Sequence, residues 1–468
     1  MSDYSRGLSR EDIEEIAEKV VGKTLGELGD FKYDLENINY KGGVGVLMEE
    51  NVFHYGANSF SEPDFLEAGI ELKTTPVKLN KNGTYSAKER LVLNIINYME
   101  EYKKTFEISS FWKKNEKLFI LFYLWEEGKL KRDYRILNYL MYEYPEEDLL
   151  IIKQDWEYIV SKIREGKAHE LSEADTLYLG ACPKGKDSSS VRRQPFSPIL
   201  AMQRAFCLKN SYMTSIVRTR VVNENKNNII SKEELRQNTF KEALYNKVKK
   251  YIGLSREKLV EIFNLNINSK DVNERIFAKM LEIEGKVNET EEFQKANILC
   301  KTIRLNENST ITESMSFPAF KFTEIIKEEW EDSSLRTYFS ENKYLFVIFK
   351  EKSGFFYFDG IKLWNMPLST LENDIKNVWL KTKEIILNGN IVKEQKRLSN
   401  GKLIIYNNFP GMKDNHVCHV RPHARDASDC YDLPIADKLT GLTTFTKQCF
   451  WLNSEYVRNI IVTGDQNV

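Results

Sequence analysis

The sequence predicts an α/β (α+β) protein of two tandem domains, each with a mixed central sheet flanked by helices. Three observations support this fold class. The chain has 468 residues, a length that fits about two to four domains. A nearly continuous apolar run, residues 117–125, has the composition of a buried central strand and lies between segments of helical periodicity. The second half of the chain repeats landmarks of the first half in the same order.

The elements of the first half follow from local patterns. Ser9 has the character of an N-cap, and apolar residues at helical spacing follow it up to Gly22. Residues 41–49 form a glycine-rich turn that leads into a second helix. A further helix is expected over 155–166, where a glycine ends it. A short strand, 177–181, precedes a basic loop.

The repeat is visible as paired landmarks. Residues 65–74 (FLEAGIELKT) align with residues 293–302 (FQKANILCKT). A tryptophan and a glycine stand ten residues apart in both halves, at Trp156 and Gly166 and again at Trp379 and Gly389. The order of these landmarks predicts a first domain over 1–221, a polar linker over 222–236 and a second domain over 237–468.

Composition limits the kinds of partner. The formal net charge is -1, so nucleic-acid binding has to come from local basic patches and not from the global field. One such patch exists, because residues 188–222 contain no acidic residue. The six cysteines form no Cys-x-x-Cys pair, which indicates reduced thiols. With no signal-peptide core and no apolar run of membrane length, we expect a cytoplasmic protein.

The stretch from Pro63 to Lys73 carries the chemistry. In a strand, Glu71 and Lys73 project to one face, while Ile70 and Leu72 project to the other. Asp64 reaches the same face from the preceding turn. Two carboxylates form a hard-oxygen site suited to Mg²⁺, which polarises a phosphodiester and acidifies bound water. The pattern predicts a nuclease, against the alternative of a solvated strand edge with an ion pair.

The second copy of this stretch has lost one acid. Leu299 stands at the position of Glu71, whereas Lys301 matches Lys73 and Glu292 matches Asp64. A leucine cannot ligate Mg²⁺, so we expect the second domain to be catalytically dead and to serve DNA binding or regulation.

A rival signal lies in the second half. His416, Cys418, His419 and His423 have spacings that could ligate zinc. The repeat favours a different interpretation, because His423 takes the place of Lys184 in the basic loop of the first copy. We therefore expect a DNA-contacting loop there, with zinc as the alternative.

Taken together, these motifs resemble the MutH family of GATC-specific endonucleases, and in particular the two-domain, GATC-cutting type II restriction enzymes of the Sau-three-A type. The resemblance covers the first half of the chain in order. It is carried by residues 24–28 (TLGEL), 41–49 (KGGVGVLME), Asp64 with 69–74 (GIELKT), 182–185 (CPKG) and 204–210 (RAFCLKN).

The resemblance implies a restriction-endonuclease-like (PD-(D/E)xK) fold in each domain and Mg²⁺-dependent cleavage of double-stranded DNA at 5′-GATC-3′, leaving 5′-phosphate ends. Asp64 and Glu71 would hold the metal, Lys73 would position the attacking water, and Glu49 would support the metal–water network. The expected DNA contacts are Lys41 and Gly42 at the minor groove, Cys182, Pro183, Lys184 and Gly185 in the base-reading loop, Arg204 and Lys209 at phosphates, and Arg421 and His423 in the second domain.

The resemblance also implies partners. A single live site cuts one strand, so we expect the protein to dimerise on DNA containing GATC. A cognate methyltransferase would share the target without needing to bind the protein, and no membrane is involved. Two alternatives remain: a mismatch-repair nicking endonuclease at GATC, and a regulator that binds GATC without cutting. Cys182 stands where the family often has arginine, which leaves the effect of DNA methylation open.

Overall fold

The computed structural model describes residues 7–29, 43–56, 61–185, 189–221, 228–311, 314–391, 393–397, 401, 403–438 and 440–462. These residues divide into two compact units. The first unit runs to Leu244 and also takes in Asn288–Ile298, and the second comprises Tyr245–Val287 and the residues from Leu299 onward. The predicted domain bounds remain a prediction, but the division shows that one segment of the second repeat belongs with the first unit.

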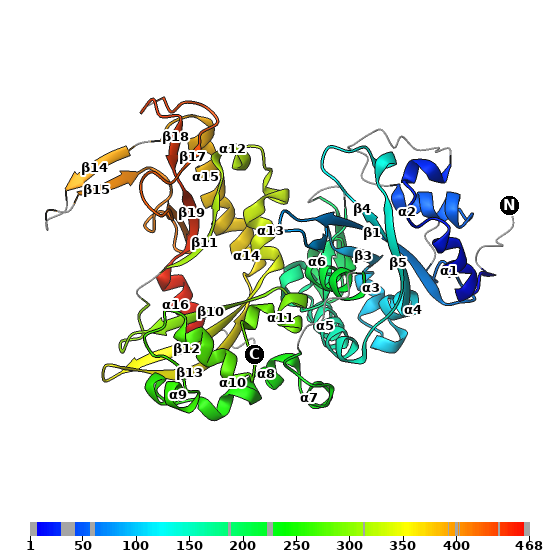
Figure 1. The fold of residues 1–468 in the computed structure, drawn as a ribbon, viewed down its shortest axis with the longest axis horizontal. Coiled ribbons are helices and arrows are strands. Elements are labelled where there is room, and N and C mark those ends of the chain that lie inside the picture. Colours follow the sequence, from blue (N-terminus) through cyan, green and yellow to red (C-terminus); the bar gives the residue numbers. More distant parts are fainter. Residues whose placement is uncertain are drawn as a thin grey trace. The chain divides into compact units, whose positions relative to one another are not determined.

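A mixed four-stranded sheet, in the order β2-β1-β4-β5, organises the first unit (Figure 1). β1 runs parallel to β4, and the other pairs are antiparallel. A second sheet has the order β3-β9-β6, and β7 and β8 form a hairpin. The bounds are β1 (Ile70–Leu79), β2 (Tyr85–Ala87), β3 (Leu91–Ile95), β4 (Lys117–Leu124), β5 (Ile136–Glu143), β6 (Leu179–Pro183), β7 (Val191–Gln194), β8 (Ser197–Met202) and β9 (Arg204–Leu208).

The helices of this unit largely follow the predicted signals. Ser9 caps α1 through a reciprocal pair of bonds with Asp12, as its sequence indicates. The predicted helix over 155–166 is longer than expected, because Pro145 and three acids start α5 nine residues earlier. The bounds are α1 (Arg10–Glu18), α2 (Val44–Leu47), α3 (Tyr98–Glu101), α4 (Ser110–Asn115), α5 (Glu146–Arg164), α6 (Asn210–Ile216), α7 (Lys232–Gln237) and α11 (Glu291–Lys295), and α8 (Phe240–Val248) begins in this unit.

The two faces of the central sheet pack differently. Ile70 and Leu72 of β1 join an apolar cluster with side chains of α1 and α2. The predicted buried strand is confirmed as β4, where residues 118–122 are all buried. Since neighbours along a strand alternate, Glu71 and Lys73 lie on the opposite face, together with their cross-strand partners Leu118 and Ile120.

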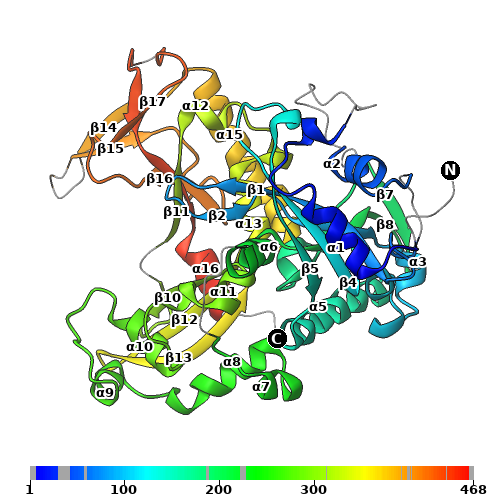
Figure 2. The same cartoon turned by 45° about the vertical axis from the view of Figure 1, so that its right-hand side comes forward.

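The second unit repeats three-strand orders of the first, and Figure 2 shows β10, β12 and β13 side by side. Its sheets have the orders β10-β12-β13 and β11-β19-β16, which match β1-β4-β5 and β3-β9-β6 strand for strand. The fold class predicted from the repeat is confirmed. The bounds are β10 (Ile298–Leu305), β11 (Met315–Phe320), β12 (Lys343–Lys352), β13 (Phe355–Trp364), β14 (Lys393–Arg397), β15 (Leu403–Asn407), β16 (Cys418–Pro422), β17 (Cys430–Asp432), β18 (Thr444–Thr446) and β19 (Gln448–Leu452).

The helices of the second unit repeat the landmarks as well. Trp156 of α5 and Trp379 of α15 are both fully buried, and Gly166 and Gly389 follow these helices with φ of 71° and 61°. No helix among the described residues is long and apolar enough to cross a membrane. The bounds are α9 (Arg256–Ile262), α10 (Val272–Met280), α12 (Phe322–Ile325), α13 (Ser334–Glu341), α14 (Leu368–Thr370), α15 (Lys376–Leu387) and α16 (Ser454–Val462).

Candidate active site

Asp64 and Glu71 form a reciprocal pair at the start of β1. The backbone N–H of Asp64 donates to Glu71 Oε2 at 3.1 Å, and the backbone N–H of Leu72 donates to Asp64 Oδ2 at 3.0 Å. The turn between them closes through backbone bonds joining Phe65 and Ile70. The Glu71 carboxylate therefore steadies the backbone of Asp64, and the Asp64 carboxylate steadies that of Leu72, the neighbour of Glu71. Asp64 and Glu71 are buried, at 8% and 3% exposure. The structure brings the two predicted acids together.

Two lysines surround the Glu71 carboxylate. Lys73 Nζ donates to Glu71 Oε1 at 2.5 Å, and Lys114 Nζ lies 3.6 Å from the same oxygen. Burial raises the pKa of Glu71, and Asp64 raises it further, whereas both lysines act in the opposite direction. Lys73 stands where the strand pattern predicts it. The sequence reasoning missed Lys114, although its place just before the buried strand β4 was an available signal.

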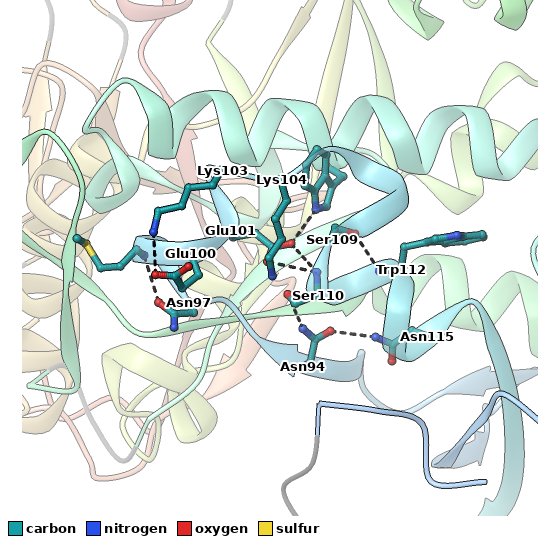
Figure 3. A network of polar contacts seen from close by, with 12 residues as sticks. Asn94, Asn97, Glu100, Glu101, Lys103, Lys104, Ser109, Ser110, Trp112 and Asn115 are labelled. Carbon is teal, nitrogen blue, oxygen red and sulfur yellow. Dashed lines mark hydrogen bonds and ion pairs between the residues drawn. The ribbon is translucent and has the colours of Figure 1, made fainter. Parts of the chain in front are cut away.

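A polar network holds the helix that carries Lys114 (Figure 3). Glu101, which is fully buried, accepts bonds from the Ser110 backbone N–H at 3.1 Å and from Trp156 Nε1 at 3.3 Å. Asn115 Nδ2 donates to Asn94 Oδ1 at 2.9 Å. These bonds attach both ends of α4 to α3, α5 and β3, so the position of Lys114 beside Glu71 is set by buried contacts and not by a flexible loop.

Glu49 completes the acidic side of the site. It lies on a π-helical turn, Met48–Val52, that continues α2, and turns of this kind are frequent at functional sites. Burial raises the pKa of Glu49 to about 7, and the charge of Asp64 contributes in the same direction. Tyr55 is buried beside Asp64. Burial raises the pKa of the Tyr55 phenol, and the charge of Asp64 raises it further. The sequence reasoning did not single out Tyr55.

The donor set fits a hard divalent cation. The oxygens of Asp64 and Glu71 lie close together in a buried site, and Asp64 and Glu71 each raise the pKa of Glu49, which marks a concentration of negative charge. Within the described residues no group of three or more His, Cys, Asp and Glu side chains has metal-binding geometry. The buried pair of Asp64 and Glu71 fits a hard divalent cation that keeps several waters.

The equivalent position in the second unit has another use. Leu299 packs against the apolar core of that unit, where Glu71 has its carboxylate in the first. Glu292, at the position of Asp64, accepts bonds from the backbone N–H groups of Ile229 and Ile230, at 2.6 and 3.0 Å. One oxygen of the remaining acid, Oε1, is thus taken by two backbone donors of the first unit.

The predicted base-reading loop is only partly presented to solvent. Pro183, Lys184 and Gly185 are exposed at the end of β6, and the backbone N–H of Lys184 is tied to Gln203 O at 2.8 Å. Cys182 is buried at 1% exposure, in a cluster with Ala205 and Cys207. The expectation that Cys182 reads bases is corrected, because its side chain points into the protein. The predicted contacts Lys41 and Gly42 lie outside the described residues.

Arg204 and Lys209 also differ from expectation. Both are 3% exposed. Arg204 Nη1 donates to the carbonyl of Ala181 at 2.7 Å, and Lys209 Nζ donates to the carbonyl of Thr176. Burial lowers the pKa of both groups. These side chains bind carbonyls of β6 and of the residues that precede it, and they do so from the protein interior. The predicted phosphate contacts are therefore incompatible with the observed burial. Arg192 and Arg193 of β7 are exposed, as is Arg220 further along this basic stretch.

In the second unit, Arg421 and His423 are both exposed at the end of β16. The Arg421 guanidinium lies 3.9 Å from the centre of the Trp451 ring, and the His423 ring lies 5.2 Å from it. His419 is buried, and its Nδ1 lies 2.5 Å from Asn453 Oδ1. The side chains that replace Cys182 and Lys184 in the repeat are thus presented on a tryptophan platform.

Comparison with known proteins agrees with this geometry. The family model described as DNA mismatch repair enzyme MutH matches residues 53–155. The type II restriction enzyme Sau3AI of Staphylococcus aureus is 39% identical over 485 aligned residues, which cover 96% of this chain and 98% of that protein. The DNA mismatch repair protein MutH of Shewanella woodyi is 33% identical over 213 residues, covering 43% of this chain and 87% of that protein. Since the similarity to Sau3AI runs through both units, this chain belongs to the MutH-like family of type II restriction endonucleases.

Proposed function

We propose that this enzyme is a Mg²⁺-dependent endonuclease that hydrolyses both strands of DNA at 5′-GATC-3′, cutting before the G and leaving 5′-phosphate and 3′-hydroxyl ends. The observation that carries the chemistry is the buried pair of Asp64 and Glu71, with Lys73 on the same face of β1. The GATC target rests on the resemblance to the MutH family.

Each side chain of the candidate active site has its own role in the proposed reaction. Asp64 and Glu71 would hold Mg²⁺, and the ion would supply polarisation of the phosphodiester and a more acidic water. An ammonium has three N–H donors, so Lys73 holds Glu71 and orients the attacking water at the same time. Glu49 accepts a hydrogen bond or a proton from that water, because its pKa of about 7 lies near the operating pH. Lys114 offsets charge that develops on the phosphate.

Sequence reading is assigned to exposed groups. In the first unit Lys184 donates to guanine acceptors in the major groove, with Pro183 and Gly185 shaping the loop. In the second unit Arg421 and His423 are exposed beside Trp451, and the guanidinium, 3.9 Å from the ring centre, donates in bidentate fashion to guanine. The second unit binds DNA without cutting, because Leu299 replaces the metal-binding glutamate.

One live site per chain cuts one strand, so a break in both strands requires two protomers or two successive nicks. We propose that the enzyme dimerises on the palindrome, since a twofold assembly matches a twofold target.

A plasmid digest tests this function. With Mg²⁺ the enzyme is expected to produce linear fragments with ends at GATC, and without Mg²⁺ it is expected to leave the plasmid intact. Nicked circles as the end product would instead support a strand-specific nickase, and an intact plasmid with a gel shift would support a non-cleaving regulator. Running the digest on methylated and unmethylated plasmid determines whether methylation blocks the enzyme.

Glu71→Ala tests the site itself. Losing one metal ligand is expected to slow cleavage by about 10³-fold or more, with DNA binding retained. Glu116→Ala is the matched control, because Glu116 is an exposed glutamate just before β4. Cleavage by Glu71→Ala at the rate of the control would show that the chemistry is elsewhere.

A further inference from the structure

Helix α11 belongs to the first unit although the sequence places it in the second repeat. It is anchored at two points. Glu292 accepts the backbone bonds of Ile229 and Ile230, and Ser211 Oγ of α6 donates to the carbonyl of Lys295 at 2.7 Å. The aligned segment of the first copy, residues 63–67, leads into the catalytic strand and has no such role. The repeat has therefore reused this segment to complete the unit that carries the live site.

The side chain of Lys295 is the centre of this contact. Its Nζ lies 2.8 and 2.9 Å from the two carboxylate oxygens of Asp148 and 2.7 Å from Glu291 Oε1. The Lys295 side chain is 9% exposed, and its ammonium lies 5.8 Å from the ring centres of Tyr178 and Tyr212. A buried carboxylate needs such a partner, because burying a charge without one costs several kcal/mol. Lys295 therefore neutralises the charge of Asp148 in the first turn of α5.

The network continues from Asp148 to the catalytic sheet. Tyr212 OH donates to Asp148 Oδ2 at 2.9 Å, and the hydroxyls of Tyr212 and Tyr142 lie 2.6 Å apart. Tyr142 of β5 is the register partner of Leu118 in β4, and Leu118 is the register partner of Glu71 in β1. Register partners project to the same face, so the network ends on the row of the sheet that presents Glu71.

We propose that Lys295 is a positioning residue for the catalytic strand. By neutralising Asp148 it maintains the Tyr212–Tyr142 bridge, and this bridge fixes the sheet row that carries Glu71. The inference rests on the proposed role of Glu71 in cleavage. It makes the second repeat a structural contributor to the live site, independently of any DNA that the second unit binds.

Two variants of the full-length enzyme test the proposal. Tyr142→Phe removes one hydroxyl at the sheet, and Lys295→Met removes the ammonium. Each is expected to lower kcat for GATC cleavage about tenfold or more, with Kd for DNA changed less than about twofold, because small misplacements of catalytic groups have large effects on the chemical step. Lys295→Arg is expected to recover most of the rate. The double variant Asp148→Asn with Lys295→Met is expected to recover part of it, since no buried charge is then left unpaired.

The controls preserve residue type and element. Tyr139→Phe alters the same strand on its opposite face, and Lys153→Met alters an exposed lysine of the same helix as Asp148. Both are expected to retain the kcat of the original enzyme. Hydrogen exchange gives a readout besides activity, because the β1 amides of Tyr142→Phe are expected to exchange faster than those of Tyr139→Phe.

Failure of the proposed function and failure of the positioning role of Lys295 give different results. If the unmodified enzyme does not cut GATC plasmid, the proposed function fails. If that enzyme cuts and Tyr142→Phe retains its kcat and exchange rates, the positioning role of Lys295 is overturned, whether or not Lys295→Met folds. A folded Lys295→Met variant with unchanged kcat overturns it equally.

Discussion

At Glu49, a single carboxyl group links the proposed catalysis to stability. Its pKa of about 7 is raised by burial and then by Asp64, so the folded protein binds a proton there that the unfolded chain has already released above about pH 4.5. Metal-free protein is therefore destabilised by this group as pH rises from about 5 to about 7, and the destabilisation is complete above that range.

Glu49→Gln is predicted to remove this pH dependence. In a metal-free buffer, the variant should gain stability relative to the original protein as pH increases from 5 to 8. Thermal unfolding at a series of pH values measures the difference. Added Mg²⁺ should reduce it, since a cation favours the ionised carboxylate. Parallel pH curves for the two proteins without metal would contradict the assigned cause.

Lys209 shows how burial changes the meaning of a basic residue. Lys209→Met is predicted to cost about 1–3 kcal/mol of unfolding free energy, because the Thr176 carbonyl loses a buried donor. It should leave the salt dependence of DNA binding unchanged. Arg192→Met, at an exposed cation, should instead reduce the slope of log K against log salt by about one with little loss of stability. A reduced slope for Lys209→Met would restore it as a phosphate contact.

At the scale of elements, α5 and α15 are each followed by a glycine with positive φ, but the surroundings of the two glycines differ. Gly166 and Gly389 both have positive φ, but a Cβ at Gly166 would lie 2.9 Å from the carbonyl oxygen of Phe196, whereas one at Gly389 would meet the flexible end of Ile435 at 3.0 Å. Gly128 also has positive φ and has no atom within 4 Å of the added Cβ position.

Alanine substitutions should therefore follow an order. Gly128→Ala is predicted to cost about 1–2 kcal/mol from backbone strain alone. Gly389→Ala should cost slightly more, and Gly166→Ala the most, because a backbone carbonyl cannot move aside easily. Denaturant unfolding of the three variants measures the differences. Equal losses would show that only the backbone conformation matters at these helix ends.

At the scale of the whole molecule, we predict that a single substitution does not restore cleavage by the second unit. Leu299→Glu in a Glu71→Ala background is predicted to leave plasmid intact, because Oε1 of Glu292 already accepts the backbone bonds of Ile229 and Ile230, which hold this carboxylate in place. The same assay with Glu71→Ala alone is the baseline. Recovery of cleavage would show that the second unit retains a complete set of ligands.

The sequence alone determined much of this protein: the two-copy α/β fold, the facing of Glu71 and Lys73, the location of the acid pair and the loss of one acid in the second copy. These are consequences of strand alternation and of order along the chain, which are local properties. It did not reveal Lys114, and it misread Cys182, Arg204 and Lys209, because burial depends on what packs around a residue. Only the tertiary structure decided that α11 joins the first unit, since the pairing of Lys295 with Asp148 spans 147 residues and leaves no periodic trace in the sequence.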